Sequence, residues 1–415
     1  MTTDSQAQRP FLIALALGIA AELLFLANLA IPAKPVFDEV YYSEAARTIA
    51  NLHGPYNIEH PLLAKTIMAG GILLFGDTSF GWRFFSTIAG AVVIMSVFAI
   101  GWQLFRRVRP ALYAAIFVLL NFIVYIQARI AMLDGYMAAF VMLAIVTMIT
   151  AARAPADTAR RWLLVSAVLL GLAVGAKWTA IPFVAFAGLA MIWLKLRGNR
   201  TYFAGIDLVP GLAILGLVSI ATYALTFAPA FFYRYEPLTI ATFIPHQFRI
   251  FAQQTAPLPL HPYQSPWWSW ALDLRPMWYL YEPVEGVQRG ILLLGNPAVM
   301  WGGLIAVGAC LYAGIRERVQ PMLAIALLWL GSYGMWVLIP KKIGFFYYYY
   351  LPSVFLGLAI AAALERYAEP RFKYASEAAL VLTFALFAYF FPIISAAPLD
   401  GDQAFLRWMW FASWR

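Results

Sequence analysis

The chain has 415 residues, of which 63% are hydrophobic and only 12% are charged. Soluble globular proteins carry about 25% charged residues, so this composition excludes a water-soluble protein and predicts a membrane protein. The net charge of +9 does not indicate a nucleic-acid partner, because most Lys and Arg residues fall between apolar runs, where they orient a membrane protein. The single cysteine, Cys310, argues against a disulfide framework and against a metal site built on cysteines.

Eleven apolar runs are long enough to cross a bilayer, which takes about 20 residues. In chain order the runs cover 11–32, 82–104, 110–127, 133–152, 162–177, 179–196, 208–228, 290–315, 321–340, 343–364 and 375–395. The first run lacks a small-residue cleavage site, so we interpret it as a retained span. The pattern therefore predicts an all-α polytopic membrane protein in which residues 1–415 form a single transmembrane domain.

The basic residues predict how these spans are oriented. Five short connections are rich in Lys and Arg, and these are 106–109, 153–161, 195–200, 316–318 and 366–373. The positive-inside rule assigns them to the cytoplasm, and with eleven spans all five fall on the same side. The amino terminus is then cytoplasmic and the carboxy terminus outside. Two long loops, 33–81 and 229–289, lie outside, and there we look for chemistry.

The first outer loop carries adjacent carboxylates, Asp38 and Glu39, just after the first span. A carboxylate in this place can act as a general base that accepts a hydroxyl proton. The apolar spacing of residues 41–52 predicts an amphipathic helix on the membrane surface. The alternative, equally favoured by the residues alone, is that both acids only cap this helix.

A second apolar segment in the same loop opens at His60-Pro61 and ends near Phe75. It is too short to span, which favours a re-entrant or interfacial helix. His60 is a candidate proton shuttle or acceptor-binding group, although a single His before Pro more often marks the start of a helix.

Three charged residues lie at the outer ends of spans. Arg129 and Asp134 belong to the segment ARIAMLD, and Lys177 lies at the end of a later span. Charged groups at membrane depth are costly and tend to be functional, so Arg129 is a candidate for binding an anionic phosphate. The alternative is an ion pair between Arg129 and Asp134. For Lys177 the same two interpretations apply, phosphate binding or an ion pair, and a third is that its amine snorkels to the membrane interface.

The second outer loop concentrates aromatic and polar side chains that suit sugar stacking and hydroxyl recognition. They are His261, Tyr263, Gln264, Ser265, Trp267, Trp268, Trp270 and Arg275. An aromatic belt at the interface is the alternative, but a belt does not require the polar members. Lys341 and Lys342 form a basic pair on the outer side, against the general trend, and are candidates for binding a phosphate.

Several enzyme classes lack their motifs in this chain. The sequence contains no P-loop, Rossmann fingerprint, HExxH pair or GxSxG elbow, so nucleotide hydrolysis, dinucleotide chemistry and serine or zinc hydrolysis have no support. A sugar nucleotide made in the cytoplasm would lie on the wrong side of the membrane, which favours a lipid-borne donor.

Five ordered stretches resemble the protein O-mannosyltransferase family, glycosyltransferase family 39 of the GT-C class. They are FDEVYYSEAA with HPLLAK, ARIAMLD, GLAVGAKWTAI, HPYQSPWWSW and FFYYYYLP. The resemblance implies eleven spans with a cytoplasmic amino terminus, a polyprenyl-phosphate sugar donor and a protein Ser or Thr acceptor. The chain departs from the family pattern at Leu62, where a second Pro is usual, and it is short and has no soluble insert. A lipid or glycan acceptor is therefore also open.

The resemblance also implies roles for single residues. Asp38 matches the catalytic base, Glu39 its neighbour in the acceptor site, and Arg129 the group that binds the carrier phosphate. His60 and the loop with His261, Tyr263, Gln264 and Trp267 would line the sugar and acceptor site. The expected reaction is an inverting single displacement in which Arg129, with Lys341 or Lys342, stabilises the departing phosphate. No metal and no cofactor are expected.

Two other functions remain open from the sequence. An aminoarabinose-type or polysaccharide-modifying transferase would share the fold and the lipid donor but not the acceptor. A lipid or sugar transporter would place its ionisable groups near the middle of the bilayer in paired halves, which this chain does not do. The expected location is a bacterial inner membrane with the site facing the periplasm or the outside. The expected partners are the donor, an acceptor protein or lipid, and membrane lipids.

Overall fold

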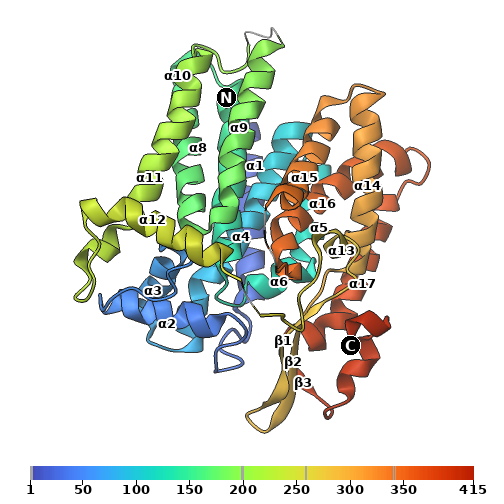
Figure 1. Ribbon diagram of the computed structural model, residues 1–415. Coiled ribbons are helices and arrows are strands. Elements are labelled where there is room, and N and C mark those ends of the chain that lie inside the picture. The colour runs from blue at the N-terminus through green and yellow to red at the C-terminus, as the bar shows by residue number, and fades with distance from the viewer. Residues whose placement is uncertain (1–2, 198–200, 258, 340, 342) are drawn as a thin grey trace. The chain divides into compact units, whose positions relative to one another are not determined.

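The computed structural model describes residues 3–197, 201–257, 259–339, 341 and 343–415. The chain is mostly helical, which confirms the main feature of the predicted fold class (Figure 1). It forms two compact units, each assembled from separate stretches of sequence. Unit 1 comprises Met1–Phe37, Val97–Ile130 and Pro257–Arg415, and unit 2 comprises Asp38–Ser96 and Ala131–Ala256.

All elements among the described residues of unit 2 are helical. They are α2 (Glu39–Ala50), α3 (Leu63–Phe75), the first part of α4 (Ser79–Phe105), α7 (Leu133–Arg153), α8 (Ala156–Ala176), η1 (Trp178–Ala180), α9 (Ile181–Leu196), α10 (Leu208–Ala213), η2 (Ile214–Val218), α11 (Ser219–Leu225), η3 (Ala228–Phe232) and α12 (Ile240–Thr255). Helices α8 and α11 approach closely at Gly171, where a Cβ atom would lie 2.5 Å from the carbonyl oxygen of Ser219. Small residues permit such contacts between membrane helices.

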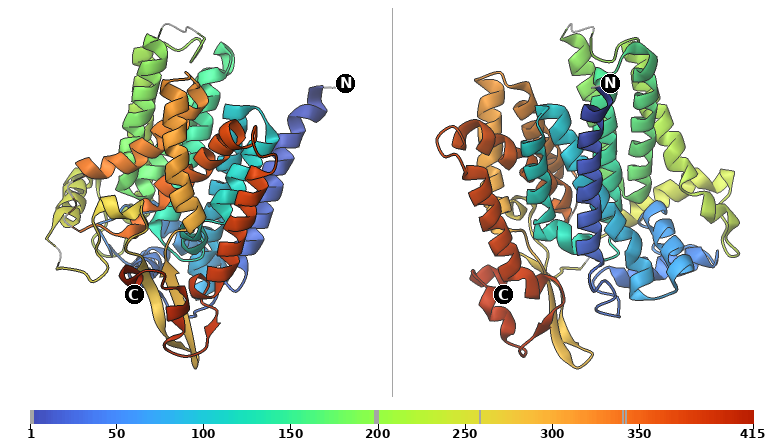
Figure 2. Two further views of the ribbon diagram at one scale, coloured as in Figure 1. Left: turned by 90° about the vertical axis from the view of Figure 1, so that its right-hand side faces the viewer. Right: turned by 180° about the vertical axis from the view of Figure 1, so that it is seen from behind.

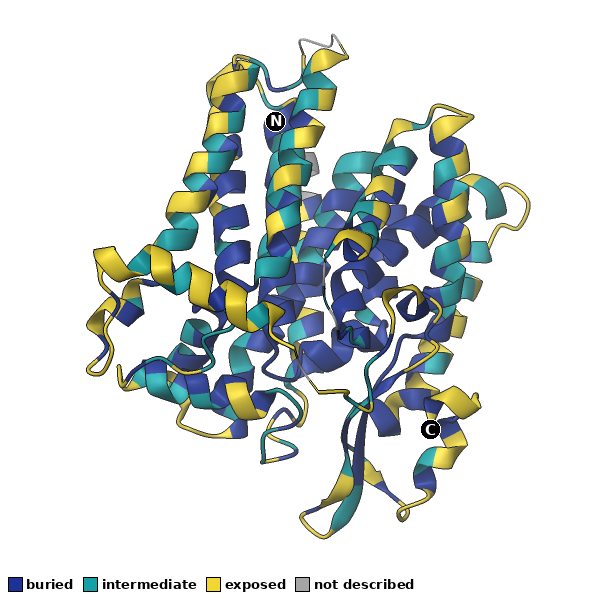
Figure 3. Ribbon diagram, in the orientation of Figure 1, coloured by how far each residue is buried: buried dark blue, intermediate teal, exposed yellow. Residues whose placement is uncertain are grey.

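Unit 1 combines helices with a small sheet. Its helical elements are α1 (Thr3–Leu26), the end of α4, α5 (Val108–Leu119), α6 (Phe122–Gln127), α13 (Trp267–Trp270), α14 (Pro297–Ile315), α15 (Gln320–Leu338), η4 (Phe346–Tyr349), α16 (Tyr350–Ala363), η5 (Leu364–Ala368), α17 (Ala375–Ile394), η6 (Ala404–Trp408) and η7 (Ala412–Trp414). Helix α16 packs against α5, α14 and α15 and is buried along nearly its whole length (Figure 3).

The prediction of an all-α fold is wrong for one part of unit 1. An antiparallel sheet in the order β1-β2-β3 forms from β1 (Met277–Val284), β2 (Val287–Leu293) and β3 (Pro398–Leu399). Both residues of the β1–β2 turn, Glu285 and Gly286, have positive φ, as a tight hairpin turn requires. The segment after α17 supplies β3 and runs beside this hairpin (Figure 2).

The sheet also corrects a predicted span boundary. Residues 290–293 were expected to begin the span 290–315, but they belong to β2, and the helix begins only at Pro297. The cause is local, because the Asn296 side chain accepts a hydrogen bond from the Ala298 N–H at 3.1 Å and Pro297 suits the first helical position.

Among the described residues, nine helical segments are long and apolar enough to cross a membrane. They correspond to nine of the eleven predicted runs. The other two runs, 11–32 and 110–127, contain the shorter apolar helices Pro10–Leu26 and Val108–Leu119. The second of these is interrupted because Asn121 caps a new helix, α6, by accepting from the Ile123 N–H at 3.4 Å. The number of eleven crossings stays a prediction.

Both long loops are largely ordered. The predicted helix over 41–52 is confirmed as α2, and the apolar segment after His60 forms α3. The loop 229–289 holds α12, α13 and the β1–β2 hairpin. These elements position the residues discussed next.

Candidate functional site

Asp38 is the N-cap residue of α2. Its carbonyl oxygen accepts hydrogen bonds from the N–H groups of Tyr41 and Tyr42 at 3.0 and 3.1 Å, which begins the helix. Its carboxylate makes no capping hydrogen bond to the helix. Asp38 thus begins α2 through its backbone and not through a side-chain hydrogen bond.

The residue before Asp38 is held by aromatic contacts within unit 1. The ring of Phe37 stacks on Tyr279 of β1, with ring centroids 4.5 Å apart and planes 18° apart, and meets Tyr347 edge-on at 5.9 Å. Phe37 has a φ of 48°, a left-handed conformation that is uncommon for a bulky residue. Lys34 adds an ion pair to Glu282 of the same strand. These contacts fix the backbone that leads into Asp38.

Glu39 points into the core of unit 2. Its carboxylate is fully buried and pairs with Arg83 of α4, through Nε at 2.8 Å and a terminal nitrogen at 2.7 Å. One carboxylate oxygen also accepts the N–H of Ala131 at 2.7 Å. Both oxygens of Glu39 are thus engaged by protein donors, and the pair joins the start of α2 to α4 and to the segment before α7.

A second buried ion pair lies in the same unit. Lys177, at the end of α8, donates to the two carboxylate oxygens of Asp134 on α7 at 2.9 and 2.7 Å. Each of these residues is at most 3% exposed. Lys177 is therefore a core partner of Asp134 rather than a side chain that snorkels to the interface.

Arg129 is anchored at the carboxyl end of α1. Its guanidinium donates to the carbonyl oxygens of Phe25 at 2.8 Å and Asn28 at 3.3 Å, and also to that of Ala27. The ring of Tyr125 lies 5.1 Å from the guanidinium carbon. A cation is favoured at this end of a helix, where carbonyl groups lack partners within the helix.

His60 lines a cavity of about 230 Å³ in unit 2. Its ring meets Tyr42 of α2 edge-on at 5.9 Å, and its carbonyl oxygen accepts a hydrogen bond from the buried Lys65 at 2.8 Å. The other walls come from residues 55–62 and 230–249, and include His246 and Arg249 of α12.

His261, Tyr263 and Gln264 form one tight turn. The Gln264 N–H donates to the carbonyl oxygen of His261 at 3.0 Å, and the Tyr263 N–H donates to the His261 ring nitrogen Nδ1 at 3.1 Å. The His261 ring also meets Phe345 edge-on at 5.2 Å. The structure thus brings this loop to the aromatic run that begins at Phe345.

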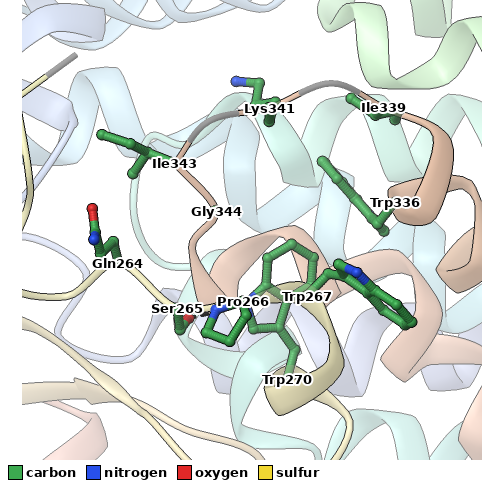
Figure 4. Close-up of a pocket in the computed structure, with 10 residues that line it drawn as sticks. All are labelled: Gln264, Ser265, Pro266, Trp267, Trp270, Trp336, Ile339, Lys341, Ile343 and Gly344. Atoms are coloured by element: carbon green, nitrogen blue, oxygen red, sulfur yellow. Dashed lines mark hydrogen bonds between the residues drawn. The ribbon is translucent and has the colours of Figure 1, made fainter. Parts of the chain in front are cut away.

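A cavity of about 390 Å³ in unit 1 lies between the loop that contains Gln264 and the segment that leads to Phe345 (Figure 4). It is lined by Gln264, Ser265, Pro266, Trp267, Trp270, Trp336, Ile339, Lys341, Ile343 and Gly344. Gly344 permits the close approach, since a Cβ atom there would lie 2.8 Å from both the Ser265 carbonyl oxygen and the Trp270 ring. Three predicted site residues, Gln264, Trp267 and Lys341, therefore share one cavity.

Lys341 is oriented by the aromatic run. Its amine donates to the Tyr348 hydroxyl at 2.8 Å and lies 5.0 Å from the centre of that ring. Lys342, the other member of the predicted basic pair, lies outside the described residues. Within those residues, no group of three or more His, Cys, Asp or Glu side chains could hold a metal ion.

Asp273 is a buried carboxyl group behind the tryptophan-rich loop. It is 1% exposed, and both of its oxygens lie 3.2 Å from the N–H of Gly295, which precedes α14. Burial raises the pKa of Asp273 from 3.8 to about 8. The folded protein therefore binds a proton at this site over a pH range in which the unfolded chain has released it.

We expect this proton to make the stability of the protein depend on pH. The proton's contribution to the free energy of unfolding is complete below about pH 4. It is lost as the pH rises towards about 8, by up to about 1.4 kcal/mol per pH unit. Asp273→Asn keeps an acceptor for Gly295 without a charge, so it should raise the midpoint of thermal unfolding at pH 8 and change it little at pH 4. Asp400→Asn, at an exposed position, is the control. Parallel pH profiles for wild type and Asp273→Asn would contradict the assignment.

Arg83 and Trp336 are two of the residues that the sequence analysis missed. Arg83 lies inside the predicted span 82–104, and a charged side chain in an apolar run is itself a signal of structural or functional importance. Trp336 lies inside the span 321–340 and carries no comparable signal, because a tryptophan near the end of a span is ordinary.

Comparison with known proteins identifies the family. Residues 59–226 match the family model described as dolichyl-phosphate-mannose-protein mannosyltransferase. Residues 239–414 match the model described as the C-terminal four-TMM region of protein-O-mannosyltransferase. The polyprenol-phosphate-mannose–protein mannosyltransferase of Mycobacterium tuberculosis is 26% identical, over 96% of this chain and 90% of the relative. The enzyme of the same name from Mycolicibacterium smegmatis is 26% identical, over 99% and 94%.

Solved structures show the same fold. The protein O-mannosyltransferase complex of S. cerevisiae bound to its sugar donor has a TM-score of 0.82 at 15% identity, covering 100% of this chain and 93% of that chain. ArnT from Cupriavidus metallidurans bound to undecaprenyl phosphate has a TM-score of 0.62 at 17% identity, covering 94% and 66%. With two family models matched in chain order and a shared multi-pass membrane fold, this chain belongs to the protein O-mannosyltransferase family of membrane glycosyltransferases.

Proposed function

We propose that this protein transfers mannose from a polyprenyl-phosphate carrier to the hydroxyl group of a Ser or Thr residue in an acceptor protein. The observation that carries the proposal is the likeness to relatives whose names state this reaction and which the chain matches over nine tenths of their length. The fold is closer to the mannosyltransferase complex, at a TM-score of 0.82, than to ArnT, at 0.62. This favours a protein acceptor over the aminoarabinose-type alternative.

The proposed chemistry is an inverting single displacement at Asp38. Its carboxylate removes the proton of the acceptor hydroxyl while that oxygen attacks the anomeric carbon, and the carrier phosphate leaves with the electrons of the broken bond. Support comes from the position of Asp38 at the start of α2, where the carboxylate does not cap the helix. Phe37, the residue before Asp38, is held in place by the stacking of its ring on Tyr279.

Charge on the departing phosphate would be stabilised by Arg129, with Lys341 or Lys342. The three carbonyl groups at the end of α1 orient the guanidinium of Arg129 before any substrate binds. Such preorganisation is what makes electrostatic stabilisation effective. Because these side chains supply the positive charge, we propose a reaction that needs neither a metal nor a cofactor.

Glu39 has a different proposed role from the one expected. Both of its carboxylate oxygens accept hydrogen bonds from Arg83 and Ala131, so we assign it to positioning the start of α2 rather than to contact with the acceptor. His60, on the cavity of unit 2, is kept as the acceptor-side group.

The cavity of unit 1 is the proposed place for the donor. Indole rings and Ile339 offer an apolar wall for isoprene units, and Lys341 offers a cation for the phosphate. Gln264 and Trp267, with His261 and Tyr263 in the adjoining turn, would then meet the sugar.

The proposed topology has eleven crossings, with the amino terminus in the cytoplasm and the carboxy terminus outside. The nine candidate spans found in the described part of the chain support it, and α1 together with the α5–α6 pair would supply the remaining two. The five basic connections then all face the cytoplasm. We propose a bacterial inner membrane with the site facing the periplasm or the outside.

The test is transfer of radiolabelled mannose from polyprenyl-phosphate mannose by the purified, reconstituted protein. Two acceptor peptides are compared that differ only by Thr or Ala at one position, and a membrane lipid extract is assayed alongside. Label on the Thr peptide alone is expected. Label in the lipid fraction alone would replace the protein acceptor by a lipid. No transfer with any of several donor sugars would reject the proposal.

A Lys341→Met variant tests the donor cavity in the same assay. Loss of a charge-assisted hydrogen bond costs about 1.5–3 kcal/mol, which corresponds to an increase of about 10–150-fold in the KM for the donor. Lys373→Met removes an exposed lysine of the predicted cytoplasmic connection 366–373 and should leave KM unchanged. An unchanged KM in Lys341→Met would place the phosphate elsewhere.

A further inference from the structure

Helix α12 carries an apolar stripe that nothing in its own unit covers. Ile240, Ile244, Phe248 and Phe251 follow one another at intervals of three or four residues, so they lie on one face of the helix. Their exposed fractions are 89%, 59%, 69% and 57%. The exposed residues of α12 are yellow in Figure 3.

The other sides of α12 are accounted for within unit 2. Ile250 is fully buried on the packed side. There Gln247 accepts a hydrogen bond from the Tyr223 hydroxyl at 2.5 Å, and Gln254 donates to the Glu59 carbonyl oxygen at 2.8 Å. A third side contains Arg249 and exposed Gln253, so the helix has separate packed, polar and apolar faces.

The connection to α11 indicates what covers the apolar face. The candidate span Leu208–Phe232 ends eight residues before α12 begins. That span has exposed side chains of its own, Leu217 at 68%, Ile220 at 65% and Leu225 at 73%, which face lipid in a membrane. Helix α12 lies crosswise to α8, α9 and α11, beside the end of α11 (Figure 1). A helix placed across the ends of spans lies along the membrane surface.

We propose that α12 is an interfacial helix whose stripe inserts into the lipid bilayer, beside the end of α11. The stripe would reach the boundary between headgroups and acyl chains, about 5–10 Å deep, as amphipathic surface helices do. Lipid is favoured over a second copy of the chain, because α12 follows directly on a candidate span that also carries exposed apolar side chains.

This contact has a consequence for the cavity around His60. Thr242, His246 and Arg249 of α12 form part of its wall. Lipid therefore holds one wall of this cavity from behind, and the cavity opens at the level of the membrane surface. The placement of α12 in the bilayer does not depend on the proposed transfer.

The test places one fluorescent probe at a time on α12 of the full chain. The only cysteine, Cys310, is buried, so a Cys310→Ala background leaves each introduced cysteine as the single site of labelling. Phe248→Cys and Ile244→Cys report the stripe, and Gln253→Cys on the polar face is the matched control. Each labelled protein is reconstituted into phosphatidylcholine vesicles. Fluorescence is then quenched either by a lipid with a nitroxide near the top of its acyl chain or by iodide in the buffer.

The expected result is severalfold stronger quenching by the lipid nitroxide at residues 244 and 248 than at 253, with the reverse order for iodide. Quenching of all three by iodide alone would overturn the proposal, because the stripe would then face water. Protection of 244 and 248 from both quenchers would also overturn it, because protein would then cover the stripe. A single symmetric elution peak and wild-type secondary structure for each variant exclude misfolding as the cause.

Discussion

Asp38→Asn is expected to lower kcat for mannosyl transfer by about 10²–10⁴-fold, the usual contribution of a positioned general base. The amide has nearly the size of the carboxylate but cannot accept the hydroxyl proton. Because the backbone carbonyl of Asp38, and not its carboxylate, begins α2, the substitution should leave the helix intact. The KM for the donor should change little. Initial rates with labelled polyprenyl-phosphate mannose and a Thr-containing peptide measure both quantities.

The control for this prediction is Asp77→Asn in the same loop. Asp77 is half exposed and forms an ion pair with Arg47 at 2.8 Å, so removal of its charge tests a general loss of negative charge in the loop. Transfer by Asp77→Asn should stay close to wild type. Transfer at the wild-type rate by Asp38→Asn would show that Asp38 is not the general base. The assignment of the family and of the fold would be unaffected.

The spans could be predicted because the bilayer imposes one strong requirement. Every buried backbone group must be satisfied within its own helix, so long apolar runs have few alternatives. The same reasoning failed at residues 290–293, where an apolar run of suitable composition pairs with β1 instead. Hydropathy cannot distinguish a buried strand from the first turn of a span, and only the cap at Asn296 marks the boundary.

The residues of the candidate site could be predicted from the sequence, but the contacts between them could not. Spacing and chemistry singled out Gln264, Trp267 and Lys341, yet only the structure reveals that they line one cavity. Pairings between distant charges were not accessible from sequence. The sequence offered only Arg129 as a partner for Asp134, whereas Asp134 binds Lys177, which lies 43 residues further along the chain. Such pairs depend on which helices pack together, and no local pattern encodes that choice.

The buried pair of Glu39 and Arg83 leads to the second large effect, one on stability. Arg83→Met should lower the free energy of unfolding by about 3–5 kcal/mol, because it leaves the buried Glu39 carboxylate without a counter-charge. The double variant Glu39→Gln, Arg83→Met should recover part of this loss, since a neutral amide can still accept the N–H of Ala131. Midpoints of thermal unfolding in detergent, taken at one scan rate, rank the variants.

Arg47→Met provides the matched control, because Arg47 also pairs with carboxylates, Glu44 and Asp77, but at the surface of the same unit. An exposed pair contributes only about 0–1 kcal/mol, so this midpoint should stay near that of the wild type. Transfer measured well below the midpoints then separates two roles for the buried pair. If it positions the start of α2, Arg83→Met loses activity even where it is folded. If Arg83→Met has full activity at low temperature but a lowered midpoint, the buried pair contributes to stability alone. An unchanged midpoint would contradict the buried pairing itself.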